Sequence, residues 1–346
     1  MLVSEVPAFR EYWYPISYSE EIGPEPYPFR LFGDDYVAWR PAEGDPVHAA
    51  VDECPHRSAR LSQGWVEGGC LVCPYHGWRF AGDGACVEIP SNGPDVPVPP
   101  RAHVQSVLAD EKYGLVWVCV GVPREPIPAL KELDDGYTLV HEMFETWAAS
   151  APRIVDNALD VSHVAWVHRN SVGTSDAPRL GDFNVERKGA HLAFSVTITA
   201  RVNEQQKANT GITSDFTQRT TYAELVQPFV FRGLLRYEEN GLEHVLYKTC
   251  TPVDDRHTKF CQFIARSDHP DAEKQQGIIA IDRRVQSEDR ALLEGVRPEF
   301  PLSLQTEMHT RADRMTVEYR RILAALAEES GPVPADSTWA RPFPRR

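Results

Sequence analysis

The stretch Cys54-Pro55-His56, followed after residues 57–72 by Cys73-Pro74-Tyr75-His76-Gly77-Trp78, is the most specific feature of the chain. Each pair places one cysteine and one histidine just before a turn-rich stretch, as two loops closing on one metal site require. Two thiolates and two imidazoles suit a zinc ion, or a 2Fe–2S cluster with both thiolates on one iron and both imidazoles on the other. Because zinc motifs usually pair like with like, the mixed pairs favour the cluster, with zinc as the alternative.

Short strands and turns surround these two pairs. Residues 10–121 have the composition of strands separated by glycine-containing turns, and a proline-rich segment follows them. We therefore divide the chain into an N-terminal domain 1–122, a linker 123–136 and a second domain 137–346.

The second domain has a different pattern. Apolar and polar residues alternate along Ala190–Val202, which predicts a strand with one buried face. Further antiparallel strands are predicted at Tyr222–Arg236, His244–Pro252 and Thr258–Arg266. Helices are predicted at 151–168, 272–294 and 303–328. The sequence thus predicts an α+β protein with two C-terminal helices.

A second group of candidate ligands lies near the start of this domain, at Asp160, His163 and His168. Asp160 and His163 are three residues apart and would share a helix face. His163 and His168 are five residues apart, which places them about 140° apart around a regular helix. Both reach one metal ion only if the helix is interrupted between them, so we predict a break there.

Two imidazoles and one carboxylate form the facial triad typical of non-haem Fe(II) oxygenases. Asp289 lies on the apolar stripe of the predicted helix 272–294, where an unpaired carboxylate is costly unless it binds a cation. Asp282 borders the same stripe and is the alternative ligand. Glu288 points about 100° away, toward Arg284, and is predicted to be a solvated neighbour.

Together, the Cys/His pairs and the Asp160-x-x-His163-x4-His168 motif resemble those of the Rieske non-haem iron oxygenases, in their oxygenase (α) component. The resemblance extends from Trp13-Tyr14-Pro15 to the helix that carries Asp289. Chain length and the segment Gln286-Ser287-Glu288-Asp289 are most similar to the shorter monooxygenase branch. That branch includes dicamba monooxygenase, vanillate O-demethylase and the hydroxylases of guanidinium-toxin biosynthesis.

The resemblance implies an N-terminal Rieske β-domain and a catalytic helix-grip domain with an antiparallel sheet. It implies a Rieske 2Fe–2S cluster held by Cys54, His56, Cys73 and His76, and a mononuclear Fe(II) held by His163, His168 and Asp289. Members are commonly homotrimers, in which Asp160 would link His76 of one chain to His163 of another. Asn157 would lie near the iron without necessarily binding it.

The implied reaction uses O2 and electrons that come from NAD(P)H through a separate reductase, with or without a ferredoxin. It hydroxylates a small aromatic or heterocyclic substrate, or removes an O- or N-methyl group from it. A cis-dihydroxylating dioxygenase is the alternative within enzymes. Outside enzymes, a Rieske electron carrier and a ligand-binding helix-grip protein with an inactive iron site are the alternatives.

Composition argues against two further classes of partner, nucleic acids and membranes. The 36 basic and 50 acidic side chains give a net charge of −14, which argues against nucleic acid, because phosphate binding needs a basic surface. The apolar run 114–122 is far shorter than the ~20 residues that span a bilayer, so no membrane partner is expected. Seven cysteines, an odd number, do not suggest a disulfide framework, and we expect a cytoplasmic protein.

The substrate pocket is harder to predict. The polar face of 190–202, the segment 205–215 and Phe229, Phe231, Phe260 and Phe263 are candidates for its lining. No concentrated set of basic residues in this region demands a carboxylate substrate.

Overall fold

The computed structural model describes residues 1–176, 178–181 and 183–330, so the part of the predicted second domain beyond Ser330 lies outside the described residues. The chain forms two compact units that separate between Ile127 and Pro128, inside the proline-rich segment. The first seven residues, Met1–Pro7, group with the second unit, where Met1 donates a hydrogen bond of 3.1 Å to the carbonyl of Phe300.

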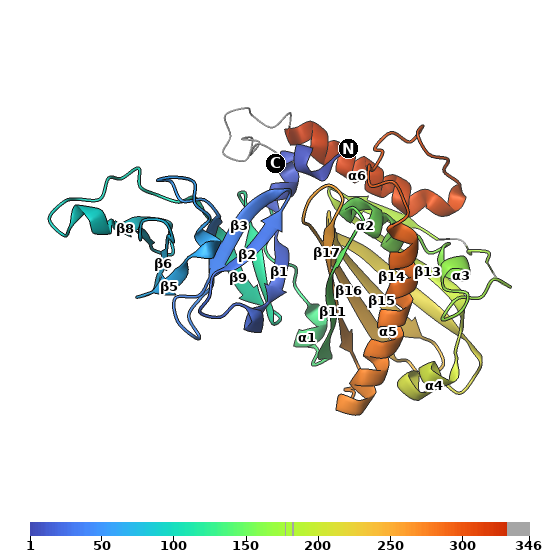
Figure 1. Cartoon of the computed structure of the whole chain (residues 1–346). Helices are drawn as coiled ribbons and strands as arrows, with labels where there is room; N and C mark the ends of the chain where they lie inside the picture. The colour runs from blue at the N-terminus through green and yellow to red at the C-terminus, as the bar shows by residue number, and fades with distance from the viewer. Residues whose placement is uncertain (177, 182, 331–346) are drawn as a thin grey trace. The chain divides into compact units, whose positions relative to one another are not determined.

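The unit Ala8–Ile127 is built from two antiparallel sheets (Figure 1). The six-stranded sheet has the order β1-β10-β9-β4-β3-β2, and the four-stranded sheet has the order β5-β6-β7-β8. Their bounds are β1 Tyr14–Tyr18, β2 Tyr27–Leu31, β3 Asp34–Trp39, β4 His48–Val51, β5 Trp65–Glu67, β6 Cys70–Val72, β7 Arg79–Phe80, β8 Cys86–Glu88, β9 Ser106–Lys112 and β10 Leu115–Cys119. Trp39 and Phe80, both fully buried, lie in a core that also contains Cys54 and Cys73.

The second unit has one seven-stranded antiparallel sheet, in the order β11-β17-β16-β15-β14-β13-β12. The strands are β11 Thr138–Trp147, β12 Val185–Lys188, β13 His191–Arg201, β14 Phe216–Gln227, β15 Val230–Tyr237, β16 Glu243–Pro252 and β17 Thr258–Arg266. The helices are α1 Lys131–Asp134, α2 Ala151–Leu159, α3 Val164–Val167, α4 Glu204–Thr210, α5 Ala272–Leu293 and α6 Arg314–Ser330. In Figure 1 the long helix α5 lies over this sheet.

These elements confirm the predicted α+β class, the antiparallel sheet and the two C-terminal helices. The strand at Ala190–Val202 and the helix at 272–294 are present as β13 and α5. The single strand predicted at Tyr222–Arg236 is wrong, because the chain turns at Pro228 and Phe229 and forms the hairpin β14–β15.

The predicted start of the last helix is also wrong. α6 begins at Arg314 rather than near 303, after a short 3-10 turn at Arg311–Asp313. Thr310 and Asp313 form a capping box there, which satisfies the first free backbone N–H groups of the helix end. Met308, which continues the apolar spacing of the helix in the sequence, is 94% exposed, so that spacing does not mark a buried face.

No helix of the described residues is both long and apolar enough to cross a membrane.

Candidate metal centre and substrate cavity

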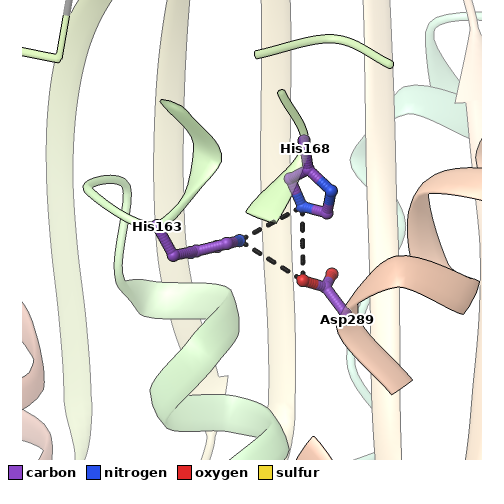
Figure 2. A group of neighbouring side chains, drawn as sticks. All are labelled: His163, His168 and Asp289. Carbon is purple, nitrogen blue, oxygen red and sulfur yellow. Dashed lines mark hydrogen bonds and ion pairs between the residues drawn. The ribbon is translucent and has the colours of Figure 1, made fainter. Parts of the chain in front are cut away.

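Side chains from two segments that are distant in sequence meet at α5: His163 and His168 from the loop region around α3, and Asp289 from α5 itself (Figure 2). The Nε2 atoms of His163 and His168 lie 3.4 and 3.2 Å from Asp289 Oδ1, and 3.3 Å from each other. The three donor atoms form a triangle with sides of about 3.3 Å. A metal ion roughly 1 Å above the plane of this triangle would lie about 2.1 Å from each donor atom, and about 2.1 Å is the usual metal–ligand distance of divalent transition metals. The three atoms therefore have the spacing of one face of a metal coordination sphere.

The backbone around α3 brings the two histidines together. α2 ends at Leu159 with Asp160 as its C-terminal cap, and the one-turn helix α3 follows at Val164–Val167. His163 lies just before α3 and His168 just after it, so a break is present, but it lies before His163 and not between the two histidines as predicted. The break begins before His163, and Asp160 and His163 therefore do not share a helix face.

Each histidine ring is oriented through its other nitrogen. His163 Nδ1 donates to the backbone carbonyl of Asp160 at 2.5 Å, and His168 Nδ1 donates to Glu288 Oε2 at 2.9 Å. With Nδ1 protonated in both rings, both Nε2 atoms carry lone pairs directed at Asp289. Such partners of the second nitrogen raise the basicity of a histidine ligand and fix its tautomer.

Glu288 is not merely the solvated neighbour of Arg284 that the sequence predicts. Its predicted neighbour Arg284 is present, at 4.0 Å from Oε1. The other oxygen, however, accepts hydrogen bonds from His168 and from Ser171 Oγ, the latter at 2.7 Å. A helical wheel of α5 could not find this, because both partners lie on the loop after α3 and are more than 100 residues away in sequence.

The surroundings of Asp289 fit a cation. The side chain is 2% exposed, and its Oδ1 atom has no hydrogen-bond donor among the described residues. Burial acts to raise the pKa of Asp289, but the neighbouring His163 and His168 and the charge of Lys248 outweigh it and hold that pKa well below its usual range. An ionised carboxylate facing two imidazole lone pairs needs a positive charge between them, which a metal ion supplies.

The other residues predicted for the site, Asp160, Asn157 and Asp282, do not belong to the group of three candidate ligands. Asp160 Oδ1 accepts hydrogen bonds from the backbone N–H and hydroxyl of Ser162, at 2.7 and 2.6 Å. Asn157 lies in the last turn of α2 and is not among the residues that line the cavity. Asp282, the alternative ligand, is two turns away from Asp289 on α5, where its Oδ2 lies 3.2 Å from His244 Nε2.

A cavity of about 140 Å³ opens beside the three candidate ligands, between the sheet and α5. Its apolar lining comes from the sheet, from α5 and from the segment 158–172, and includes Phe231, Leu246, Ile281 and Val285. Of the lining predicted from sequence, Phe231 and three residues of the segment 205–215 are present: Gln206, Asn209 and Thr210. The polar face of β13 and the other three phenylalanines are not among the lining residues.

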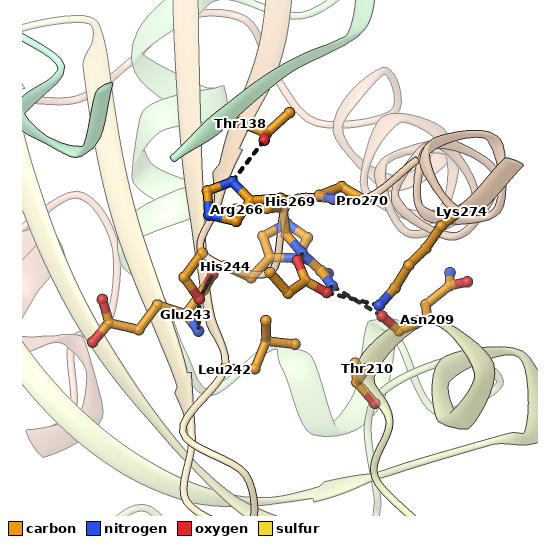
Figure 3. A network of polar contacts seen from close by, with 12 residues as sticks. Thr138, Asn209, Thr210, Leu242, Glu243, His244, Arg266, His269, Pro270 and Lys274 are labelled. Carbon is orange, nitrogen blue, oxygen red and sulfur yellow. Dashed lines mark hydrogen bonds and ion pairs between the residues drawn. The ribbon is translucent and has the colours of Figure 1, made fainter. Parts of the chain in front are cut away.

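The end of the cavity near α4 is held by a polar network around Arg266 (Figure 3). The Arg266 guanidinium, 1% exposed, donates to Asp268 through two bonds of 2.8 and 2.7 Å and to the carbonyl of Asn209 at 2.9 Å. It also contacts His244 Nδ1 at 3.2 Å, and Lys274 Nζ donates to Asp268 at 2.8 Å. This network ties β16 and β17 to α4 and to the start of α5.

A buried carboxyl pair lies further along the sheet. Gln262 Nε2 donates to Glu142 Oε2 at 2.7 Å, and both side chains are buried. Burial and the negative charge of Asp282 raise the pKa of Glu142 well above its usual range. Burial also acts to raise the pKa of Asp282, but His244 and the hydrogen bond with Glu142 lower it overall. Of the two carboxyls, Glu142 is therefore the one that is protonated more readily.

The two Cys/His pairs occupy matching loops in the unit Ala8–Ile127. In each loop the cysteine carbonyl accepts from the N–H four residues later, that of Ser58 at 2.9 Å or Gly77 at 3.0 Å. In each, the cysteine N–H donates to the carbonyl five residues later. Ser58 and Gly77 both have positive φ, 54° and 70°, so the two loops share the same backbone turn.

The side chains of these loops converge as a cluster site requires. The rings of His56 and His76 lie 4.4 Å apart, and the ring of Trp78 stacks on that of His56 at 4.6 Å. Burial, together with the adjacent Cys73, raises the pKa of Cys54 to about 12. The buried His56 Nδ1 has no hydrogen-bond partner in the described part of the chain. Buried thiols and a buried, unpartnered imidazole nitrogen fit residues that bind iron.

Comparison with known families agrees with both sites. The family described as the Rieske 2Fe–2S domain matches residues 12–107. The family described as the vanillate O-demethylase oxygenase C-terminal domain matches residues 147–329, more than half of the chain. The first match contains both Cys/His loops, and the second contains His163, His168 and Asp289.

Curated proteins and solved structures extend the comparison to nearly the whole chain. The methylxanthine N3-demethylase of Pseudomonas putida is 29% identical over 336 residues, which cover 92% of this chain and 90% of that protein. The structure of Pseudomonas putida NdmA with caffeine matches with 27% identity and a TM-score of 0.79, covering 93% of this chain and 92% of that one. Dicamba monooxygenase bound to 3,6-dichlorosalicylic acid has the same fold, with 21% identity, a TM-score of 0.80 and coverages of 94% and 98%.

Proposed function

The chain belongs to the Rieske non-haem iron oxygenases, and we propose that it is the oxygenase component of a monooxygenase that acts on a small aromatic or heterocyclic molecule. The observation that carries this proposal is the triangle of His163, His168 and Asp289 beside a cavity, in a chain that also has the two Cys/His loops. Neither a simple electron carrier nor a ligand carrier needs both features.

We assign the ligands as the geometry suggests. Cys54, His56, Cys73 and His76 would hold the Rieske cluster. His163, His168 and Asp289 would hold the mononuclear iron, with Glu288 and the Asp160 carbonyl orienting the two imidazoles. When bound, the iron supplies the centre at which O2 is reduced with electrons that arrive through the cluster.

The reaction balances as substrate C–H plus O2, two electrons and two protons giving C–OH and one water. Where the oxidised carbon is an O- or N-methyl group, the hydroxylated methyl leaves as formaldehyde. The apolar walls of the cavity hold the substrate body next to the triad and exclude water. The N-demethylases among the relatives support the demethylating form of this reaction.

The proposal also covers the electron donors, the oligomeric state and the location of the oxygenase. Electrons would come from NAD(P)H through a separate reductase, with or without a ferredoxin. The oxygenase would work as a homotrimer in the cytoplasm, where the cysteines outside the proposed cluster stay reduced. In the trimer Asp160, half-exposed next to His163, would connect that histidine to His76 of the neighbouring chain.

The decisive experiment is a metal and sulfide analysis of anaerobically purified protein, combined with EPR after dithionite reduction. Three irons and two acid-labile sulfides per chain, with a Rieske-type signal, are the expected result. Two irons and two sulfides would identify an electron carrier or an inactive iron site instead. Zinc without sulfide would overturn both the cluster and the oxygenase proposal.

The product distinguishes the monooxygenase from the alternative dioxygenase. With ¹⁸O2, a monooxygenase places one labelled oxygen atom in the product and the other in water. Two labelled atoms in one cis-diol would show that the dihydroxylating alternative is correct.

A further inference from the structure

Two cations that line the cavity form no salt bridge with any described residue. Lys248 and Arg219 are each only 8% exposed and both face the cavity. In the described part of the chain, neither side chain forms a salt bridge within 4.0 Å or a hydrogen bond. The Lys248 ammonium lies 6.0 Å from the ring centre of Phe231, and Arg219 Nε is buried without a partner. Arg266, by contrast, is fully paired with Asp268.

An unpaired buried charge is costly, and the cost is recovered when an ion of opposite sign enters. The carboxylates nearest to the cavity are already engaged. Asp289 faces the two histidines, Asp282 faces His244, and Asp160 accepts from Ser162. The positive charge on the cavity wall is thus available to a molecule that binds there.

Lys248 is the cation at the metal end of the cavity. α5 runs alongside β11 in the same direction, because Arg283 contacts the Glu142 carbonyl at 2.9 Å and Glu294 contacts the Ala148 N–H at 3.1 Å. Lys248 pairs across the sheet with Gln262, and Gln262 pairs with Met143, the neighbour of Glu142. The row that contains Lys248 is therefore level with Arg283 in the middle of α5, and Asp289 lies six residues further on, about 9 Å along the helix axis.

Arg219 lies at the other end. Leu225 of β14 is in register with Phe231, which is in register with Lys248. Arg219 is six residues away from Leu225 along β14, which corresponds to about 20 Å of strand. A small molecule at the metal triad is therefore within reach of Lys248 but not of Arg219.

We propose that the substrate is a small organic monoanion, a carboxylate or sulfonate, whose charged group pairs with Lys248. This inference rests on the proposed oxygenase function, because it names the substrate class of the same cavity. A volume of about 140 Å³, with roughly 10–15 Å³ needed for each water-sized group, admits a body of about ten non-hydrogen atoms. The apolar lining, with Phe231 beside Lys248, suits an aromatic ring that carries the acid.

Anaerobic calorimetry on the iron-loaded oxygenase tests this without electron transfer. The probes are benzoate, 3- and 4-methoxybenzoate and benzenesulfonate, each compared with its uncharged amide or sulfonamide. We expect at least one acid to bind at least tenfold more tightly than its neutral twin. Lys248→Met should lower the affinity for that acid by about 10- to 100-fold, which corresponds to the loss of a charge-assisted hydrogen bond. The affinity for the amide should not change.

Two further variants make the result specific. Arg219→Met removes the other unpaired cation of the cavity, and Lys259→Met removes a lysine of β17 that does not line it. Neither is expected to change the preference for the acid by more than about threefold. The proposal is overturned if no acid binds more tightly than its twin, if Lys248→Met binds the acid as wild type does, or if Arg219→Met alone abolishes the preference.

The outcome separates this inference from the proposed function. Acid binding that depends on Lys248, without turnover in the presence of reductase and O2, would support the anion site and count against the oxygenase. Turnover of uncharged substrates only, unchanged in Lys248→Met, would support the oxygenase and overturn the anion site.

Discussion

Each histidine of the metal triad owes its orientation to the group that its second nitrogen contacts. For His163 that group is a backbone carbonyl, which substitution cannot remove. For His168 it is the side chain of Glu288, which also accepts from Ser171. Glu288 is thus placed as a positioning residue, and its contribution can be measured separately from that of Asp289, the adjacent candidate ligand.

Replacing Glu288 with alanine is expected to weaken iron binding by about 10- to 100-fold, because His168 loses the acceptor that fixes its tautomer. Glu288→Gln, which keeps an acceptor oxygen, should lose only a few-fold. The affinity for Fe(II) is measured by anaerobic titration of the iron-depleted protein. Glu273→Gln, an exposed carboxylate in the first turn of the same helix, is the control and should bind iron normally. Equal iron affinity in Glu288→Ala and wild type would contradict the positioning role.

Asp268 gives a prediction on pH. Burial acts to raise its pKa, but the hydrogen bonds from Arg266 and Lys274 outweigh burial and hold that pKa well below the ordinary value of 3.8. A carboxyl whose pKa is depressed by folding stabilises the protein above that ordinary value, and the stabilisation is lost as the pH falls below it.

We therefore expect Asp268→Asn to lower the free energy of unfolding by about 1–3 kcal/mol at neutral pH, since the buried Arg266 loses its ionic partner. The difference from wild type should be constant between pH 5 and 8 and should shrink only below about pH 4. Urea unfolding followed by fluorescence at a series of pH values measures it. A difference that shrinks between pH 8 and 5 would show that another group is responsible.

Among the elements, α3 is the one on which the metal centre depends most. It is a single turn, and its position is set by packing rather than by its own helix stability. Gly173 makes that packing possible, because a Cβ atom at this residue would lie 2.0 Å from the Val164 carbonyl oxygen. The Gly173 N–H also donates to the His168 carbonyl at 2.8 Å.

Gly173→Ala is expected to displace α3, separate His163 from His168 and lower the iron content of the purified protein at least several-fold. The Rieske signal should be unchanged, because the Cys/His loops belong to the other compact unit. Gly181→Ala is the matched control, since a Cβ atom there meets nothing within 4 Å. Full iron occupancy in Gly173→Ala would show that α3 tolerates the displacement.

Helix α5 combines three roles that the sequence presents as one amphipathic stripe. Asp282 and Asp289, two turns apart, both line the cavity, yet one contacts His244 and the other the two candidate metal ligands. Glu288, one position before Asp289, turns toward the loop that follows α3. The helix thus carries one candidate metal ligand, the residue that orients a second candidate ligand, and part of the cavity wall.

At the scale of the whole molecule, the two proposed metal sites belong to different compact units of the chain. The proposed trimer, in which Asp160 of one chain meets His76 of another, makes electron transfer a property of the assembly. Light scattering during size-exclusion chromatography should then give a mass of about 117 kDa, three times that of the 39.0 kDa chain. A monomer that is fully active would contradict the assembly.

Mixed oligomers test the electron route directly. His76→Cys should alter the Rieske cluster and Asp289→Ala should remove the iron, so each homo-oligomer should be inactive. When the two variants are co-expressed, oligomers that pair an intact cluster with the intact iron of a neighbour should recover a measurable part of wild-type turnover. No recovery in confirmed mixed oligomers would mean that the electron passes within one chain.

Much of the fold follows from local patterns. The period-two alternation of β13 and the apolar stripe of α5 appear in the sequence because each element buries one face. The hairpin at Pro228 was missed because both arms are strand-like and the turn is short. The start of α6 was missed because the apolar spacing continues past the capping box at Thr310.

The chemistry of the two metal sites was visible in the sequence for a physical reason. Coordination demands particular donor atoms at close spacing, and short loops place such residues near one another in the chain, as in Cys54-Pro55-His56. Asp289 was found despite its distance because a carboxylate on a buried stripe is costly without a cation. These signals are local, so they can be recognised in a single amino-acid sequence.

Glu288, Gly173 and Lys248 were not visible in the same way. Glu288 acquires its role from a loop more than 100 residues away, and Gly173 from its distance to the Val164 carbonyl. Lys248 is one charged residue in an ordinary strand until the packing of α5 over the sheet leaves it buried with no salt bridge to any described residue. Pairing and burial are properties of surfaces that meet only in the folded chain, and folding alone settled which charges on the cavity wall were neutralised and which stayed open to a ligand.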